Sequence, residues 1–395
     1  MKVLHVITAL NVGGAETMLA KLVEHERMHG YAVQSSVASL MPPGAGADRI
    51  RASGTPVHDC GLTGPLTLLP SLFRLRAVVR QVQPDLIMAW MYHAHIAATL
   101  ASGLMPRKIP LIWNVRHSID DIRQEKPALR AVVRTAALLS DLPHSIIYNS
   151  HAAAGQHQRL GFHAGHAMVI SNGFDPDLFR PREGAREQLA AKLGIDPGSL
   201  IIGMAARNHP MKDAANLAEA VLIARQSGVD AHLILTGEGM DRPTGRLAEL
   251  LEALPSDRVT LRGHDGSLAE LLQGLDLLVL PSAWGEGFPN ILGEAMACGI
   301  ACIATDVGDS GWVLGDTGII VPPRDAAALA DGIVSLDRMG PDGRRQLGAA
   351  ARARVKERFS MSRIAGMYSD LYRSAGGAGI PRNLFQAGIG PAQVM

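Results

Sequence analysis

The chain has 395 residues, 47% of them hydrophobic and only 4% aromatic, and its formal net charge is +1. This length exceeds what one ordinary hydrophobic core fills and suits two domains of typical size. The near-neutral charge argues against a nucleic-acid-binding protein, and no stretch approaches the length of an apolar membrane-spanning helix.

Short apolar runs alternate with amphipathic segments of helical length along the first half of the chain. Helical patterns cover residues 15–29, 72–82 and 129–140, among others. Strands that alternate with helices indicate βαβ units and a parallel sheet. The predicted strands are residues 3–8, 32–40, 56–60, 86–90, 110–114, 146–149 and 168–170.

Residues 172–199 interrupt this alternation, because proline, glycine and charged residues cluster there as in an interdomain linker. The alternation then resumes. We therefore predict an α/β protein with two doubly wound, Rossmann-like domains, residues 1–178 and 179–358, that face a central cleft. Ligands of such sheets bind at the carboxyl ends of the strands. The predicted strands of the second domain are residues 200–205, 231–236, 259–262, 277–280, 301–304 and 318–321.

The two ends of the chain and its cysteines also carry information. The apolar N-terminal run is short and stops at a Gly-Gly turn, so a buried strand explains it better than a signal peptide. Cys60, Cys298 and Cys302 lack metal-ligand spacing, and we expect free thiols in the cytoplasm. The glycine-rich tail 375–395 is expected to be poorly ordered.

The segment WGEGFPNILGEAMACG, residues 284–299, carries the strongest chemical signal. It follows an apolar strand and leads through a glycine-containing loop into a helix, which is an arrangement that binds anions. Pro289 suits the first helical position. Amides around it, at Gly287, Phe288 and Asn290, would then face a diphosphate, which the helix dipole favours.

Two carboxylates flank this predicted anion site. Glu294 lies about 7 Å further along the helix at roughly 1.5 Å per residue, where it could accept from both ribose hydroxyls. Glu286 lies before the helix, on the other side of the phosphates, where the sugar to be transferred would lie. The segment therefore predicts a nucleotide-sugar site; the alternative is a surface loop with two ordinary glutamates.

Arg207 and Lys212 form a second candidate anion-binding pair, in the loop after the first strand of the second domain. They are five residues apart across a loop that contains a proline, so both can reach one anion. Fixed cations would stabilise the charge of a departing nucleoside diphosphate, commonly the largest catalytic contribution. The alternative is a pair of solvated surface cations.

Two glycine turns follow predicted strands. Gly13 and Gly14 expose backbone at the carboxyl end of the first strand, but the G-x-G-x-x-G spacing of NAD and FAD sites is absent. Gly237 and Glu238 follow the strand 231–236. This second turn could shape a base pocket or could simply reverse the chain.

Histidines and one acidic motif raise the question of acid–base or metal chemistry. His117 follows a strand and could bond a sugar hydroxyl or move a proton. His93 and His95 lack a third ligand at a clear spacing, so we interpret them as helix-start residues. Asp175 and Asp177 form a D-x-D motif inside the linker, where turn chemistry explains them better. We expect no metal site.

Basic residues also recur on apolar helical patterns. Arg74, Arg76 and Arg80 lie within residues 66–83, and Arg130 and Arg134 follow later. Such helices could rest on an anionic membrane surface. A packed helix with a solvated arginine edge is the alternative.

The sequence resembles the family-4 retaining glycosyltransferases of the GT-B fold from Met1 to about Tyr372. The resemblance is carried by the E-x7-E element of Glu286 and Glu294, and by further motifs along the chain. The run AARNHPM before Lys212 departs from the GRL-type run that is usual in the family. The further motifs are Gly13-Gly14-Ala15-Glu16, Asn172-Gly173-Phe174-Asp175 with Phe179, and Arg207 with Lys212.

This resemblance implies retaining, metal-independent transfer of a hexose-type sugar from a nucleoside-diphosphate sugar to an acceptor hydroxyl, without a cofactor. Glu294 would bind the ribose, Glu286 the donor sugar, and Arg207 with Lys212 the diphosphate. His117 would lie near the donor sugar. A C-terminal helix, residues 359–374, would cross back onto the N-terminal domain.

The acceptor is implied only at the level of the family. Many relatives build surface polysaccharides or glycolipids, so a sugar or a lipid-linked saccharide is expected, with peripheral contact to an anionic membrane at its cytoplasmic face. Two other functions remain open: a GT-B nucleotide-sugar epimerase, and a non-catalytic nucleotide-sugar-binding protein.

Overall fold

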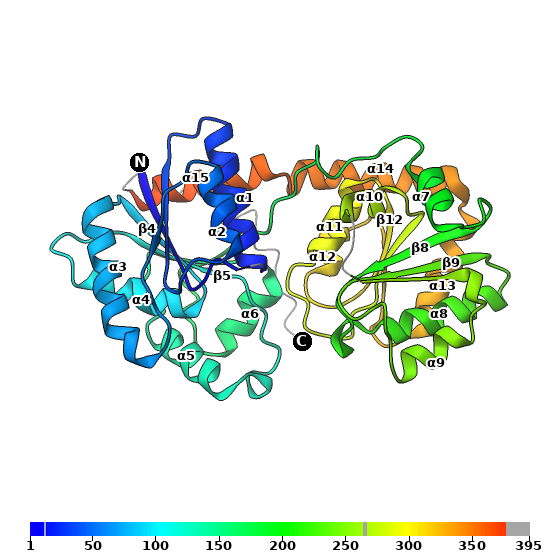
Figure 1. The fold of residues 1–395 in the computed structure, drawn as a ribbon, viewed down its shortest axis with the longest axis horizontal. Helices are drawn as coiled ribbons and strands as arrows, with labels where there is room; N and C mark the ends of the chain where they lie inside the picture. The colour runs from blue at the N-terminus through cyan, green and yellow to red at the C-terminus, as the bar shows by residue number, and fades with distance from the viewer. Residues whose placement is uncertain (12, 264–266, 377–395) are drawn as a thin grey trace. The chain divides into compact units, whose positions relative to one another are not determined.

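The computed structural model describes residues 1–11, 13–263 and 267–376, which form two compact units (Figure 1). Unit 1 comprises Met1–Gly173 together with the C-terminal segment that begins at Met361, and unit 2 comprises Phe174–Ser360. The sequence placed the corresponding boundaries after residues 178 and 358. None of the helices in the described ranges is long and apolar enough to cross a bilayer.

Unit 1 is built on a seven-stranded parallel sheet with the order β3-β2-β1-β4-β5-β6-β7. The order runs outward from β1 in both directions, so the sheet is doubly wound, as predicted. β4 and β5 are buried along their whole length, which is why they read as continuous apolar runs. The strands are β1 Lys2–Ile7, β2 Gln34–Ser39, β3 Val57–Asp59, β4 Leu86–Trp90, β5 Leu111–Val115, β6 Ser145–Tyr148 and β7 Ala167–Val169.

Helices cover both faces of this sheet. α3, α4, α5 and α6 bury apolar residues against one face, and α1, α2 and α15 do so against the other. α15 lies beside α1 and buries Tyr368 and Tyr372. The helices are α1 Gly14–Met28, α2 Ala45–Ala52, α3 Leu68–Val82, α4 Tyr92–Gly103, α5 Pro127–Leu138, α6 His151–Arg159 and α15 Met361–Ala375, with short 3-10 turns η1 Pro65–Thr67 and η2 Ile122–Gln124.

Unit 2 has a six-stranded parallel sheet with the order β10-β9-β8-β11-β12-β13. Its order reverses between β8 and β11, and at such a switch point the adjacent loops diverge and leave room for a ligand. The strands are β8 Leu200–Ala205, β9 Ala231–Thr236, β10 Val259–Arg262, β11 Leu277–Leu280, β12 Ala301–Thr305 and β13 Ile319–Val321.

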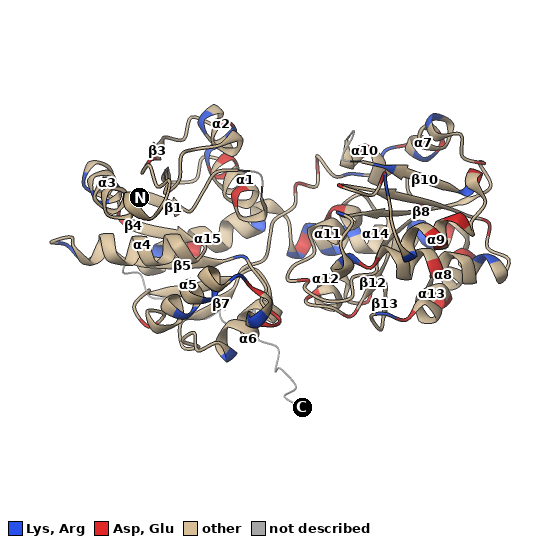
Figure 2. Cartoon of the chain, turned by 60° about the horizontal axis from the view of Figure 1, so that its bottom comes forward, with Lys and Arg blue, Asp and Glu red and all other residues tan. Residues whose placement is uncertain are grey.

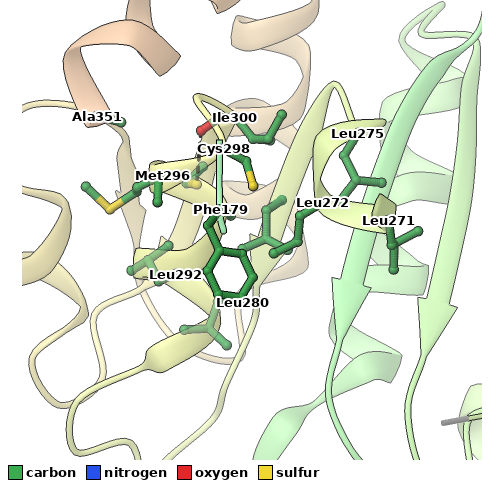
Figure 3. Close-up of a cluster of buried hydrophobic side chains, with 14 of the residues drawn as sticks. Phe179, Leu271, Leu272, Leu275, Leu280, Leu292, Met296, Cys298, Ile300 and Ala351 are labelled. Atoms are coloured by element: carbon green, nitrogen blue, oxygen red, sulfur yellow. Dashed lines mark hydrogen bonds between the residues drawn. The ribbon is translucent and has the colours of Figure 1, made fainter. Parts of the chain in front are cut away.

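Two hydrophobic layers sandwich the second sheet. α8, α9 and α13 pack on one face, and α7, α10, α11, α12 and α14 pack on the other. Figure 3 shows the second layer, in which the ring of Phe179 lies among leucines of α10, α11 and β11. The helices are α7 Ala185–Leu193, α8 Ala214–Gln226, α9 Arg246–Glu252, α10 Leu268–Gln273, α11 Asn290–Ala297, α12 Ser310–Leu314, α13 Ala326–Arg338 and α14 Gly340–Arg358, with short turns η3 Pro210–Lys212 and η4 Ser256–Arg258.

The interpretation of residues 172–199 as a linker was wrong. Phe174 pairs with the end of α14, donating its amide to the Phe359 carbonyl at 2.8 Å. Leu189 and Ala190 of α7 are buried in the core of unit 2. The nine-residue helix α7 is flanked by Gly184 and Gly194. Because glycines are typical of loops, its short apolar pattern was not recognised as a helix. From Phe174 onward the segment is therefore part of unit 2.

Candidate active site

A cavity of about 650 Å³ opens at the carboxyl edge of the unit 2 sheet, next to its switch point. It is bounded by the ends of β8, β9 and β10 and by the N-terminal parts of α10 and α11. The polar residues of its lining are Arg207, Thr236, Glu238, Arg262, Ser267, Asn290 and Glu294. The structure thus brings together five of the residues that the sequence singled out, namely Arg207, Gly237, Glu238, Asn290 and Glu294.

The start of α11 forms one wall of this cavity. The helix begins at Asn290, and Pro289 is the cap residue before it rather than the first helical residue. This one-residue difference follows from the extended ψ of Pro289, 98°. No side chain of the cap residue bonds the first turn, and the helix dipole favours negative charge at this end. Glu294 follows Asn290 by one turn, so both side chains lie on the same face of the helix.

A tight contact between two turns shapes the opposite wall. Gly237 has φ +134°, and a Cβ there would lie 2.1 Å from the Ala206 carbonyl oxygen, so only glycine fits. The Asn208 amide donates to the Glu238 carbonyl at 2.8 Å. These contacts hold the loop after β8 against the loop after β9. The guanidinium of Arg207 is exposed there and has no carboxylate partner within the described ranges.

Lys212 and Glu286 meet beside this cavity but are not part of its lining. Lys212 ends the short turn η3, and Glu286 lies in the loop after β11. The ammonium of Lys212 donates to the Glu286 carboxylate, and only 18% and 8% of the two side chains are exposed. The Ser282 hydroxyl donates to the same carboxylate oxygen at 2.5 Å. Glu286 is therefore held by two donors from two different loops.

Backbone contacts fix the loops that carry this pair. His209 Nδ1 accepts from the Met211 amide at 3.1 Å, and the Met211 carbonyl accepts from the Ala283 amide at 2.9 Å. The run that departs from the usual family pattern therefore forms an ordered turn. The Thr305 hydroxyl donates to the Ser282 carbonyl at 2.6 Å. This hydrogen bond from the last residue of β12 holds Ser282 in place after β11. The Ser282 hydroxyl in turn holds the Glu286 carboxylate.

Phe288 and Gly287 contribute to the loop in different ways. The Phe288 ring is buried and packs against Phe174, Trp312 and Phe359, with centroids 5.9, 6.2 and 5.6 Å away. Any contact of Phe288 with a donor must therefore come from its backbone. The Gly287 carbonyl accepts from the Asp309 amide at 3.0 Å.

The remaining predicted site residues lie in unit 1, at the carboxyl edge of its own sheet. Gly13 caps α1, which begins at Gly14, and the Glu16 carboxylate lies over it. His117 follows β5, and its Nε2 lies 3.5 Å from a Glu125 carboxylate oxygen. Burial lowers the pKa of His117, and the charge of Glu125 opposes this shift. The functional roles of Gly13, Gly14 and His117 stay predictions.

The structure also bears on metal binding. Asp175 Oδ1 accepts from the amides of Asp177 and Leu178 at 2.8 and 3.2 Å, which is the turn expected for the D-x-D motif. Within the described ranges one group has ligand atoms close enough for a metal ion, and it lies at the surface of unit 1: Asp141, His163 and His166. It shares no residue with the predicted site.

Four site residues escaped the sequence interpretation. Arg262 and Thr236 line the cavity from the last positions of β10 and β9, and Ser267 lies at the start of α10. Their location at strand ends was a usable signal for the first two. No sequence signal marked Ser282, because its hydrogen bond to Glu286 depends on how the loop after β11 folds back on itself.

Two family descriptions match most of the chain between them. "Glycosyltransferase Family 4" matches residues 12–178, and "Glycosyl transferases group 1" matches residues 199–338. The N-acetyl-alpha-D-glucosaminyl L-malate synthase of Bacillus anthracis is 28% identical over 284 residues, covering 70% of this chain and 71% of the relative. A D-inositol 3-phosphate glycosyltransferase of Saccharomonospora viridis is 30% identical over 244 residues, covering 58% and 55%.

Solved structures share the architecture. Anabaena HepE in complex with UDP superposes with a TM-score of 0.81 at 23% identity, covering 95% of this chain and 100% of that one. HepE in complex with UDP-glucose gives a TM-score of 0.77 with the same identity and coverage. The chain belongs to the family-4, group 1 glycosyltransferases and has the GT-B fold.

Proposed function

We propose that this glycosyltransferase moves a hexose-type sugar from a nucleoside-diphosphate sugar to an acceptor hydroxyl with retention of anomeric configuration. The observation that carries the proposal is the cavity of unit 2, where Glu294 lies one turn beyond the start of α11 and Arg207 lies across from it. Anabaena HepE, which shares the fold, was crystallised with UDP and with UDP-glucose.

The polar groups of the cavity suit the parts of such a donor. The Glu294 carboxylate can accept hydrogen bonds from both ribose hydroxyls, because it offers two oxygens. The diphosphate would lie at the start of α11, where the helix dipole favours its charge. Arg207, Arg262 and Lys212 are the cations of the surrounding strand ends and loops that would contact it. Glu238 and Gly237 would lie at the base.

The transfer step requires no nucleophilic residue of the protein. The bond between the anomeric carbon and the diphosphate oxygen breaks, and a bond from the acceptor oxygen forms on the same face of the sugar. The acceptor proton passes to the departing phosphate oxygen. Arg207 and Lys212 stabilise the negative charge that develops there. Glu286, already bonded to Lys212 and Ser282, would orient the sugar rather than attack it.

We further propose that this step needs no metal ion, because fixed cations supply the charge that Mg²⁺ supplies elsewhere. A sugar or lipid-linked saccharide would be the acceptor, in surface polysaccharide or glycolipid synthesis. Activity that is equal with EDTA and with added Mg²⁺ supports the first statement. Activity that appears only with a divalent cation contradicts it.

Thermal-shift measurements with UDP-, GDP- and ADP-sugars test the donor site, because a ligand that binds only the native state raises its stability. Stabilisation should be lost in Glu294→Ala and kept in Glu249→Ala, which alters an exposed glutamate on α9. Equal stabilisation of both variants would refute the assignment of Glu294.

The stabilising donor is then incubated with the protein, with and without an acceptor pool. NMR of the product should show the anomeric configuration of the donor, and inversion would contradict retention. An epimer formed from donor alone would identify an epimerase instead. Binding without turnover in any acceptor pool would identify a non-catalytic nucleotide-sugar-binding protein.

A further inference from the structure

Two histidines and one aspartate of unit 1 converge on a single point. Asp141, His163 and His166 each offer a ligand atom, and these three atoms all lie within 4.8 Å of one another. Asp141 Oδ1 lies 3.4 Å from His163 Nε2 and 3.9 Å from His166 Nε2. Both imidazole rings therefore turn the same nitrogen toward one carboxylate oxygen. We call these three residues the His–His–Asp group.

The separations in the His–His–Asp group suit a tetrahedral metal ion. With metal–ligand bonds of about 2.1 Å, two ligand atoms of a tetrahedral Zn²⁺ site lie about 3.4 Å apart. Asp141 and His163 already have this separation. Nε2 of His166 is slightly farther away, and its partly exposed side chain can rotate inward. Two imidazoles and a carboxylate are ligands that Zn²⁺ uses, and a water would take the fourth position.

A cluster of protonated side chains explains this geometry less well. The two imidazole rings are tilted by 33° with their centroids 4.9 Å apart, so two imidazolium charges would repel each other over a short distance. One carboxylate neutralises only one of them. A metal ion instead binds both rings in their neutral form, and the carboxylate offsets part of its charge. The arrangement therefore favours a shared cation over two ion pairs.

Hydrogen bonds hold the backbone that carries the three ligands. The His163 amide donates to the hydroxyl of Ser140, the residue before Asp141, at 2.8 Å. The His166 carbonyl accepts from the Ile146 amide at 2.8 Å. β6 and the connection before it are thus joined to the connection between α6 and β7 before any ion binds. A site whose parts are already placed loses less conformational entropy on binding.

Gly165, between the two histidines, leaves the space that the His163 ring occupies. A Cβ at this position would lie 2.8 Å from His163 Cε1, which is closer than two such carbon atoms pack. The ring therefore lies directly against bare backbone. The absence of a side chain at position 165 lets His163 keep its Nε2 turned toward Asp141.

The His–His–Asp group lies at the amino-terminal edge of the unit 1 sheet. Asp141 precedes β6, and His163 and His166 precede β7; because β6 and β7 are parallel, both connections enter the sheet at the same edge. β7 is a three-residue strand at the end of the sheet, and α5, α6 and β7 pack together in unit 1 (Figure 2). His117 follows β5 at the opposite edge. An ion bound here would therefore take no part in the transfer step.

We propose that the His–His–Asp group binds one Zn²⁺, which joins the α5–β6 connection to the α6–β7 connection and stabilises this end of the unit 1 sheet. A short strand at the end of a sheet has one neighbouring strand to hold it, and the ion adds a second link. The proposal departs from the expectation of no metal site, for which His93 and His95 were considered. It is independent of the proposed transfer reaction.

Isothermal titration of the untagged full chain with Zn²⁺, after EDTA treatment and removal of the EDTA, tests the site. One Zn²⁺ should bind per chain, and Mg²⁺, which prefers oxygen ligands, should not bind. Cys60, Cys298 and Cys302 are buried and should not compete. His163→Ala and Asp141→Ala should each weaken Zn²⁺ binding about a hundredfold or more, because loss of even a hydrogen-bond partner of a ligand weakens binding about 10- to 100-fold.

Thermal unfolding tests the structural role of the ion. Zn²⁺ should raise the unfolding temperature of the unaltered chain and leave that of His163→Ala and Asp141→Ala unchanged. Without metal, both variants should unfold near the temperature of the unaltered chain, because the altered side chains are exposed. The matched control is His93→Ala, which removes an exposed histidine of α4 outside the group and should bind Zn²⁺ like the unaltered chain.

The outcome for the donor site is separate. Loss of nucleotide-induced stabilisation would contradict the proposed function and leave the Zn²⁺ result standing. Conversely, His163→Ala should keep nucleotide-induced stabilisation, since its side chain lies in unit 1 and the donor cavity lies in unit 2.

Three results would overturn the proposal. The first is a titration in which no Zn²⁺ binds at one ion per chain. The second is equal binding by His163→Ala, Asp141→Ala and the unaltered chain, which would place the ion elsewhere. The third is binding that leaves the unfolding temperature unchanged, which would show an adventitious surface ion only.

Discussion

Lys212 and Glu286, 74 residues apart in the sequence, form an ion pair in the loops that follow β8 and β11. Both side chains are largely buried, so each is the main counter-charge of the other. A buried charge that loses its partner costs about 3 kcal/mol or more. Removing either of the two residues proposed to handle the diphosphate and the donor sugar should therefore also destabilise this edge of the sheet.

Single substitutions in this pair should affect stability as well as catalysis. Lys212→Ala or Glu286→Ala should each lower the free energy of unfolding by about 3 kcal/mol, because either leaves a buried charge unpaired. The double variant should lose much less than the sum. Urea unfolding of the four proteins gives the coupling energy. Additive losses would show that the pair is not formed in solution.

The same substitutions should reduce transfer by about a hundredfold or more, as the removal of one electrostatic contact to a transition state does. Assays must be run well below the unfolding midpoint of each variant. Arg225→Ala serves as a control, because Arg225 pairs with Asp230 at 3.3 Å away from the cavity. Turnover equal to that of the unaltered enzyme in Glu286→Ala would refute the assigned role.

A side chain at position 308 should lower activity, because Gly308 packs directly against the backbone of the loop that carries Glu286. It has φ +60°, and a Cβ would lie 2.1 Å from the Glu286 carbonyl oxygen. Gly308→Ala should therefore displace Glu286 and lower turnover while donor-induced stabilisation by Glu294 and Arg207 persists. Gly194→Ala is the matched control, since Gly194 has φ +68° and open space around it.

Both glycine variants should lose roughly 1 to 2 kcal/mol of stability through left-handed backbone strain, and Gly308→Ala should lose more, because its Cβ must also displace the Glu286 carbonyl. Only Gly308→Ala should lose activity. Equal activity of the two variants would mean that the loop relaxes without moving Glu286.

Much of this architecture was readable from the sequence. All thirteen strands lie within about two residues of their predicted positions, because buried parallel strands form apolar runs bounded by turn residues. α7 was missed since a nine-residue helix between glycines has too few turns to show a period. The ring of Phe288 could not be assigned from sequence, because its burial depends on Phe174 and Phe359, which come from distant segments.

The cavity lining was only partly predictable for a similar reason. Arg207, Glu238 and Glu294 follow recognisable strand ends or a helix start. Ser282 gains its function through hydrogen bonds to Glu286 and from Thr305. Those bonds exist because β11 lies between β8 and β12 in the sheet. Residues that position others depend on tertiary neighbours, and sequence patterns do not encode these neighbours locally.

Stability of unit 1 should depend on pH through Glu26. This side chain is buried, and its carboxylate accepts from the Ser35 hydroxyl at 3.1 Å. Burial raises the pKa of Glu26 to about 7, and the bond from Ser35 opposes this shift. The native state thus holds a proton that the unfolded chain releases near its usual pKa of 4.5.

The sign of the effect follows from this difference. Below about pH 4.5 both states are protonated and the contribution of Glu26 to stability is fully present; it is lost as the pH rises toward about 7. The loss should be of the order of 3 kcal/mol at about 1.4 kcal/mol per pKa unit. Glu26→Gln keeps the hydrogen-bonding shape without the titration. The stability difference between the unaltered chain and Glu26→Gln should therefore change across this window and stay constant above about pH 8. A difference that is independent of pH from 4 to 8 would show that Glu26 titrates normally, and hence that it is not buried in solution.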